Sequence, residues 1–344
     1  MYFEGSAKIE KTDKTFLNPE MKTCRDISVA VLKEWPNNEK ILDAMCATGI
    51  RGIRYILEDG AKDVTFLDAS DDAISMAKKN LEINNVHGEF VLKDANEFLF
   101  STWEKFDVIE LDPFGTPSPY LLGAARAAKR SSLLSVTATD TAVLCGAHTG
   151  CEKIYGAKPG HNECCKEVGL RILLGKIARD AGQWNFGIIP WLSLSSKHFM
   201  KVFVELKWGA EYSDASAKLA LGNYSYCQKC MQRSFKWNEK CDCGEKMRHA
   251  GPLWVGDLFT KIPNSEEKPA EKLLGLMRGE TKLQKYPYYD LHKLCELLSI
   301  NVPSFDEIAD KINSSGFGFA RTHIDEVGFR TDMPLNELKK ALVV

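Results

Sequence analysis

The first half of the chain alternates short apolar runs with segments in which apolar residues recur at helical spacing. The apolar runs predict strands at residues 40–43, 64–68, 89–92, 106–109, 132–137, 186–190 and 199–206. The intervening segments 52–57, 72–84 and 120–128 predict helices, and Ser70 or Asp71 is suited to cap the second of them. Such alternation is typical of a doubly wound α/β domain with a mostly parallel sheet.

The pattern changes after Trp208. A basic, cysteine-rich stretch occupies residues 226–247, and the prolines and polar residues of 263–270 predict a linker. Segments 289–298, 305–314 and 335–342 then predict three short helices. The length of the chain also favours two domains. We expect an α/β domain at 1–255, which includes a cysteine-rich segment at 224–248, and a smaller α+β domain at 256–344.

Four acidic residues stand where predicted strands end. Asp43 opens a loop that runs to Gly52, whereas Asp68, Asp94 and Asp112 follow the next three strands. Strand ends of a doubly wound sheet meet at one edge, where ligands bind. Asp68 has the spacing at which a carboxylate accepts hydrogen bonds from ribose hydroxyls, and Asp94 is placed to meet an adenine amino group.

The loop after Asp43 contains no G-x-G-x-x-G sequence, which argues against a dinucleotide, because a pyrophosphate needs close approach to the backbone. Its small residues are Ala44, Ala47, Gly49 and Gly52. A nucleoside cofactor without phosphates suits this loop better, and S-adenosylmethionine is such a cofactor. The predicted fold is therefore a Rossmann-like class I methyltransferase domain.

The sequence Asp112-Pro113-Phe114-Gly115 directly follows a predicted strand. An amino group on a nucleobase is a poor nucleophile, because its lone pair is delocalised into the ring. The carboxylate of Asp112 and the carbonyl of Pro113 are acceptors that could hold such an amino group, and Phe114 could stack on an extruded base. This chemistry needs no thiol, so Cys46, Cys145, Cys151, Cys164 and Cys165 are interpreted as structural; thiol attack on a pyrimidine is the rival mechanism.

Four cysteines are grouped as C-x-x-C and C-x-C, ten residues apart. Four thiolates suit a closed, structural zinc site, with reduced free thiols as the alternative. His249 could substitute as a ligand, but the favoured interpretation is an ordinary surface histidine. The predicted ligands are Cys227, Cys230, Cys241 and Cys243. Nearby cations and aromatic residues suit contact with an RNA backbone, namely Lys229, Arg233, Lys236, Lys246 and Arg248, with Tyr226 and Trp237.

Charge and composition exclude some classes of protein. The net charge of −2 argues against a protein that coats nucleic acid, although residues 218–248 are locally basic. No apolar run is long enough to span a membrane, and the first residues do not resemble a secretion signal. We therefore expect a cytoplasmic protein whose cysteines are reduced, with no membrane association and no obligate protein partner.

Several motifs together resemble the tRNA guanine-26 N2-dimethyltransferase family over nearly the whole chain. The residues that carry the resemblance are 4–9, 16–19 with Arg25-Asp26, 42–52, 112–117, 139–142, 155–156, Glu167 with 170–174, 321–323 and 330–332. Two features depart from the family pattern. Lys166 stands where the family is expected to have histidine, and the C-x-C pair is unusually tight.

The resemblance implies transfer of one or two methyl groups from S-adenosylmethionine to N2 of guanine 26 in tRNA. It implies that Phe16 and Phe114 flank the guanine while Asp112 holds its amino group. It further implies cofactor contacts from Arg25, Arg51 or Arg54, Asp68, Asp94 and Ala95, and a C-terminal domain that binds tRNA.

Two alternatives stay open at this point. One is a methyltransferase that acts on an amino group of another RNA, of DNA or of a protein; the other is an RNA-binding protein without activity. The segment 317–323, which interleaves aromatic residues, glycine and base, suits either RNA contact or a buried hairpin.

Overall fold

A computed structural model describes residues 1–13, 15–196 and 198–343 of the chain. Its centre is a seven-stranded sheet in the order β5-β4-β3-β6-β7-β9-β8, in which β9 alone runs antiparallel to its neighbours. The strands are β3 (Lys40–Ala44), β4 (Asp63–Asp68), β5 (Glu89–Leu92), β6 (Phe106–Leu111), β7 (Ala128–Ala138), β8 (Phe186–Ser195) and β9 (Met200–Trp208). The doubly wound α/β fold is thus confirmed.

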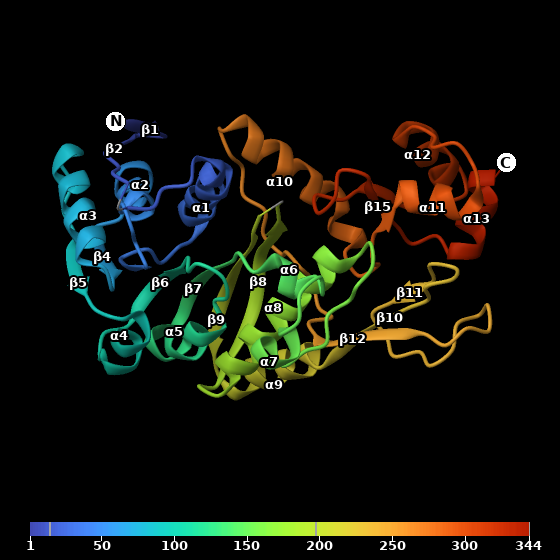
Figure 1. Ribbon diagram of the computed structural model, residues 1–344, viewed down its shortest axis with the longest axis horizontal. Helices are drawn as coiled ribbons and strands as arrows, with labels where there is room; N and C mark the ends of the chain where they lie inside the picture. Colours follow the sequence, from blue (N-terminus) through green and yellow to red (C-terminus); the bar gives the residue numbers. More distant parts are fainter. Residues whose placement is uncertain (14, 197, 344) are drawn as a thin grey trace.

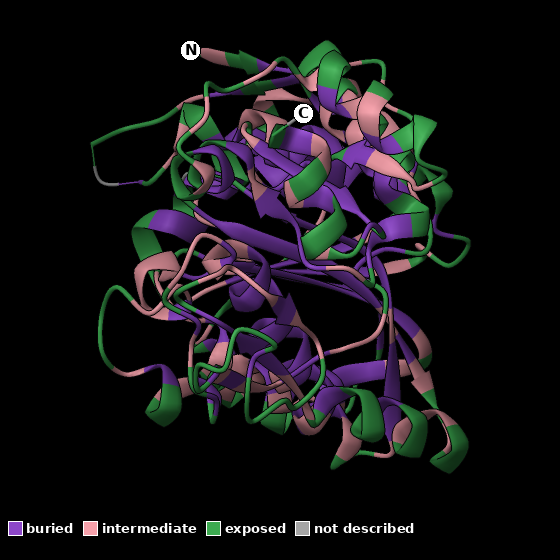
Figure 2. Cartoon of the chain, turned by 90° about the vertical axis from the view of Figure 1, so that its right-hand side faces the viewer, coloured by how far each residue is buried: buried purple, intermediate pink, exposed green. Residues whose placement is uncertain are grey.

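Helices cover both faces of this sheet (Figure 1). One layer contains α1 (Lys22–Glu34), α2 (Ile50–Asp59) and α3 (Asp71–Ile83). The other contains α4 (Ala95–Ser101), α5 (Leu121–Ala127), α8 (Cys165–Gly182) and α9 (Ala210–Ala220), with the short α6 (Thr141–Leu144) and α7 (Cys151–Tyr155) beside α8. Because both faces are covered, every residue of the central strand β6 is buried, and Figure 2 shows the buried strands between more exposed helices.

Most predicted elements lie within a few residues of the observed ones. Helix α2 begins at Ile50, earlier than its predicted start, because Gly49 adopts a left-handed conformation with φ of 74° and turns the chain into the helix. The side chain of Ser70 caps α3. A short hairpin at the N-terminus, β1 (Tyr2–Glu4) and β2 (Ala7–Ile9), contacts α2 and α3 and was missing from the sequence prediction.

The cysteine-rich segment is carried by a small antiparallel sheet of β10 (Gly222–Tyr226), β11 (Arg233–Ser234) and β12 (Arg248–Leu253). A third sheet, β13 (Tyr289–Asp290), β14 (Phe319–Arg321) and β15 (Gly328–Thr331), packs with α11 (Leu291–Leu298), α12 (Phe305–Ser314) and α13 (Leu335–Val343) around a separate apolar cluster. The helix predicted from residue 289 begins later, because Tyr289 and Asp290 pair with β15. The boundary between residues 255 and 256 stays a prediction.

The predicted linker is wrong at its C-terminal end. Helix α10 (Lys268–Glu280) already begins at Lys268, and Pro269 fits its first turn because proline lacks only an N–H that the helix does not use there. The buried residues Ala270, Leu274 and Met277 of α10 join the large core of the α/β domain. Among the described residues, no helix has both the length and the apolar character needed to cross a membrane.

A buried ionic network fastens the C-terminal third to α8. Glu167 of α8 accepts hydrogen bonds from Arg171 and Arg330, each at 3.0 Å, and Glu280 of α10 pairs with Arg330 and His323. The other imidazole nitrogen of His323 lies 2.9 Å from the carbonyl oxygen of Ser193 in β8. Thr322 and His323 are therefore buried, whereas Arg321 beside them is exposed.

We expect Glu280→Gln to lower the free energy of unfolding by about 3–5 kcal/mol, because it removes the carboxylate that pairs with the buried His323 and one of the two carboxylates that pair with the buried Arg330. Burial raises the pKa of Glu280, but the charges of His323 and Arg330 outweigh it and lower this pKa to about 2. The stabilisation by Glu280 is therefore present above pH 4.5 and lost as the pH falls towards 2. Urea unfolding at a series of pH values measures both effects.

The matched control is Glu271→Gln in the same helix, where the partly exposed Glu271 pairs with Arg278 and should contribute less than about 1 kcal/mol. Equal losses of stability in the two variants would contradict a special role for the network.

Candidate active site

A cavity of about 650 Å³ lies where the strand order reverses, outside the carboxyl ends of β3 and β6. This is the position at which doubly wound sheets bind ligands. Its lining includes most of the residues predicted from sequence, namely Phe16, Arg25, Asp43, Arg51, Asp68, Asp112, Pro113 and Phe114. Residues about 100 positions apart in the chain thus meet at one cavity.

The loop between β3 and α2 has a tightly fixed shape. Met45 and Ala47 both have positive φ values, 61° and 48°, which is uncommon for residues with a side chain. The loop is held by Asp68, whose Oδ2 accepts a hydrogen bond of 3.0 Å from the backbone N–H of Ala47. Gly52 is required for packing, since an added Cβ would lie 2.4 Å from the ring of Phe66. The strain in the loop is therefore balanced by contacts from the neighbouring strand.

Asp43 is buried below this loop and accepts a hydrogen bond of 3.0 Å from the N–H of Gly52. Burial raises its pKa to about 7, although the charge of Arg51 opposes the shift. A positively charged ligand in the cavity would favour the ionised carboxylate. Burial also raises the pKa of the neighbouring Cys46 thiol well above its ordinary value, so this cysteine is unsuited to act as a nucleophile.

Asp112 is held at the rim of the cavity by Arg51. The guanidinium donates a hydrogen bond of 2.6 Å to Oδ2 of Asp112 and another of 2.8 Å to Oγ of Ser28. Burial raises the pKa of Asp112, but the charges of Arg51 and Lys201 outweigh it and hold the pKa below its ordinary value. Asp112 is therefore a carboxylate at neutral pH and can accept hydrogen bonds.

A buried group of side chains supports Arg51 from below. Nε of Arg51 lies 3.4 Å from Oε1 of Glu110, which also pairs with Lys201, while Tyr55 donates a hydrogen bond of 2.9 Å to Oε2. Sequence reasoning missed Glu110 and Lys201. The signal was present, because each is a charged residue within an apolar run that forms a central strand.

The loop after Asp112 is fixed by a neighbouring segment. Gly115 and Thr139 exchange hydrogen bonds, with the Gly115 N–H 2.6 Å from Oγ1 of Thr139 and the Thr139 N–H 2.9 Å from the Gly115 carbonyl. The rings of Phe114 and Phe16 touch edge to face, with centroids 4.6 Å apart and an interplanar angle of 78°. Both rings are more than half exposed, so a flat ligand can reach them from solvent.

Three residues predicted to contact a cofactor do not line this cavity. Arg54 is buried, and its guanidinium pairs with Glu4, Asp26 and Glu58. Asp94 caps α4 by accepting a hydrogen bond from the N–H of Glu97, and Ala95 is buried behind it. Arg25 does line the cavity, but its guanidinium is paired with Glu4 at 2.5 Å. The lining residues not proposed from sequence include Met21, Tyr120, Thr139 and His198.

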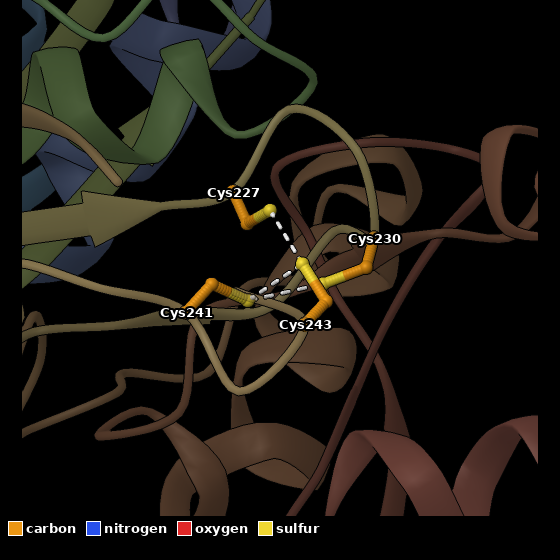
Figure 3. Close-up of side chains that lie close together, drawn as sticks. All are labelled: Cys227, Cys230, Cys241 and Cys243. Atoms are coloured by element: carbon orange, nitrogen blue, oxygen red, sulfur yellow. Dashed lines mark hydrogen bonds between the residues drawn. The ribbon is translucent and has the colours of Figure 1, made fainter. Parts of the chain in front are cut away.

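The four cysteines of the small sheet form one cluster (Figure 3). Their Sγ atoms all lie within 4.8 Å of one another, and three pairs are 3.3–3.6 Å apart. A tetrahedral zinc site with bonds of about 2.3 Å needs Sγ atoms about 3.8 Å apart, so the cluster fits the ion after small movements.

The structure corrects two expectations around the cysteine cluster, those for Arg233 and Tyr226. The ring of His249 stacks on Trp237 with centroids 3.7 Å apart and lies outside the cluster. Arg233 is buried and pairs with Glu163, because it faces the main body of the protein, and Tyr226 is buried as well. These two residues are thus unavailable to RNA, whereas Lys236, Lys246 and Arg248 are exposed.

Comparison with known proteins identifies the family. A family model described as N2,N2-dimethylguanosine tRNA methyltransferase matches residues 2–343. The tRNA (guanine(26)-N(2))-dimethyltransferase of Methanobrevibacter smithii is 37% identical and covers 97% of this chain and 92% of its own length. The tRNA (guanine(26)-N(2)/guanine(27)-N(2))-dimethyltransferase of Aquifex aeolicus is 36% identical, covering 95% and 89%.

A solved structure agrees with both relatives. Trm1 from Pyrococcus horikoshii, in complex with S-adenosyl-L-methionine, superposes with a TM-score of 0.88 at 34% identity and covers 99% of this chain and 98% of its own. The resemblance seen in the motifs is therefore confirmed over the whole length of the fold. The chain belongs to the N2,N2-dimethylguanosine tRNA methyltransferase family.

Proposed function

We propose that the chain transfers one or two methyl groups from S-adenosylmethionine to the exocyclic N2 of guanine 26 in tRNA. The observation that carries this proposal is the ionised Asp112, which Arg51 holds at the rim of the cavity beside two exposed aromatic rings. Family membership supports the same reaction and substrate. A cytoplasmic location is consistent with this role and stays a prediction.

The residues at the rim suit a guanine that has left its stack. Phe16 and Phe114 offer ring faces, and they must separate from their present edge-to-face contact before a base can lie between them. The Asp112 carboxylate and the Pro113 carbonyl then accept hydrogen bonds from the amino group. These acceptors localise the lone pair on N2, and Asp112 takes the proton that N2 releases as its new bond forms.

Residues deeper in the cavity suit the cofactor, which supplies an activated methyl group. The carboxylate of Asp68 can accept hydrogen bonds from ribose hydroxyls, and Asp43 offers a negative charge to a cationic ligand. Ile50 and Met45 provide apolar contacts at the same cavity. Asp94 and Ala95 lie at the start of α4, after β5, where they would face the adenine end; this assignment stays a prediction.

The cysteine cluster is proposed to hold a structural zinc ion. Cys227, Cys230, Cys241 and Cys243 supply four thiolates, and Met247 is the one other described residue in their small apolar cluster. The ion would therefore fix the fold of the segment rather than take part in chemistry. Exposed Lys236, Lys246 and Arg248 on this segment can then contact phosphates of tRNA.

We expect Asp112→Asn to slow methyl transfer by at least 100-fold while changing the affinity for S-adenosylmethionine by less than about tenfold. The amide keeps the size of the side chain but is no longer a base or an anion for Arg51. The measurement is labelled-methyl transfer to tRNA with guanine or adenine at position 26, with mass spectrometry of the nucleosides.

Glu97→Gln, an exposed change on α4, is the control and should retain full activity. A product other than N2-methylated guanosine would overturn the proposed substrate. Loss of cofactor affinity in Asp112→Asn, with normal turnover once saturated, would instead assign Asp112 to cofactor binding.

Cofactor binding should tighten as the pH rises from 5.5 to 7. Asp43 has a pKa of about 7, so binding of a cation to the ionised form must release a proton below that pH. The α-amino group of the cofactor stays largely charged in this range, since α-amino groups titrate near pH 8. Titration calorimetry in buffers of different ionisation enthalpy measures the proton release.

The neutral analogue 5′-methylthioadenosine should bind with little dependence on pH. Asp43→Asn should bind S-adenosylmethionine more weakly and without proton release. If Asp43→Asn released as many protons on cofactor binding as the natural protein does, a group other than Asp43 would be the source of those protons.

The purified protein should contain one zinc ion per chain, measured by plasma mass spectrometry. Cys230→Ser should lower the zinc content and the melting temperature together, because the site contributes to folding of the segment. Cys295→Ser, which changes a buried cysteine outside the cluster, is the control and should keep its zinc. The proposed site would be contradicted if the natural protein contained no zinc and Cys230→Ser had the same melting temperature as the natural protein.

A further inference from the structure

A second cleft lies at the opposite edge of the sheet from the candidate active site. It has a volume of about 830 Å³ and is formed at the amino ends of β6, β7 and β8 and the end of the antiparallel β9. The two edges are roughly 20 Å apart, which is the length of a six-residue strand such as β6. None of the described residues lines both the cleft and the active-site cavity.

Three tryptophans line this cleft and remain accessible to solvent. Trp103 is 88% exposed, Trp208 is 44% exposed and Trp184 is 41% exposed. Trp103 follows α4, Trp184 precedes β8 and Trp208 ends β9, so three separate segments bring the rings together. Grouped tryptophans that stay exposed are a feature of binding surfaces, because each ring loses favourable burial while the cleft is empty.

Cations are interleaved with these rings. The guanidinium of Arg130 lies 4.4 Å from the ring centroid of Trp208, and that of Arg126 lies 6.0 Å from the ring centroid of Trp103. Lys105 adds a further positive charge. The single carboxylate among the lining residues, Asp107, is already paired with Lys129 at 2.7 Å. The cleft therefore presents a positive field beside flat apolar faces.

The support beneath Trp103 is well defined. Arg126 of α5 donates hydrogen bonds of 3.0 Å and 2.8 Å to the carbonyls of Leu99 and Thr102, at the end of α4. These bonds fix the chain directly before Trp103, and Figure 1 shows α4 and α5 beside each other. The exposed ring is thus presented by a fixed segment rather than by a free loop.

We propose that this cleft binds unpaired nucleotides of an RNA chain, as a site separate from the one where methyl transfer takes place. A nucleotide combines a flat base with an anionic phosphate. In the cleft, the tryptophan rings can stack on the base and the neighbouring cations can pair with the phosphate. An acidic peptide would use the charges but would leave most of the tryptophan faces without a planar partner. The choice of RNA over DNA rests on the proposed function of the chain.

The test is the binding of a fluorescein-labelled decauridylate, measured by anisotropy at 50–200 mM salt with the full-length protein. Trp103→Ala and Trp208→Ala should each weaken binding about 5- to 100-fold, because each removes a stacking partner. Arg130→Gln should reduce the slope of log K against log salt by about 0.7, the value for one phosphate contact with a single strand.

Phe3→Ala is the matched control, since Phe3 is an aromatic residue that is 65% exposed but lies on the N-terminal hairpin. Its affinity for the oligonucleotide should be unchanged. Absence of oligonucleotide binding, or equal losses in Phe3→Ala and the two cleft variants, would overturn the proposal. Concentration-dependent dimers in sedimentation that disappear in Trp103→Ala would also overturn it, by identifying the cleft as a contact between two copies of the chain.

Methylation of tRNA by the same variants separates this proposal from the proposed function. Trp103→Ala should retain the rate of methyl transfer at saturating tRNA, because the ring lies far from Asp112. If the natural protein failed to methylate tRNA, the proposed function would be wrong. The proposal for the cleft would still be decided by the oligonucleotide-binding experiment.

Discussion

The carboxylate of Glu110 organises the candidate active site from inside the sheet. It lies in a strand in which every residue is buried, and it pairs with Lys201 and Arg51 while accepting a hydrogen bond from Tyr55. A buried carboxylate is costly unless several donors surround it, and here the donors come from two elements, α2 and β9. Arg51 in turn reaches Asp112 and Ser28, so the geometry at the rim depends on Glu110, which is not among the described residues that line the cavity.

The Rossmann-like fold could be predicted from sequence because its signal is local. A buried parallel strand is a short apolar run, and the helices between the strands show their own spacing. The acidic residues at the strand ends could be predicted for the same reason, since topology alone brings strand ends to one edge. Asp43, Asp68 and Asp112 meet at the cavity on this basis.

The remaining features depend on contacts that sequence spacing does not encode. Arg51 and Arg54 lie on one helix three residues apart, yet one faces Asp112 and the other is enclosed by Glu4, Asp26 and Glu58. The difference arises from the N-terminal hairpin, whose Glu4 provides one of the three carboxylates that pair with Arg54. Likewise, nothing in the local sequence of Arg233 indicates that Glu163, 70 residues earlier, removes it from the surface.

The contact between α1 and α10 has a consequence for how the chain is made. Helix α1 ends at Glu34, but the surface on which it meets α10 is complete only when Glu280 has been synthesised. At translation rates of about 5–20 residues per second, the interval between these two residues is roughly 12–50 seconds. During that time the surface of α1 that meets α10 has no native partner. A nascent chain of this protein therefore has a period of exposure to chaperones or to aggregation that the finished fold no longer shows.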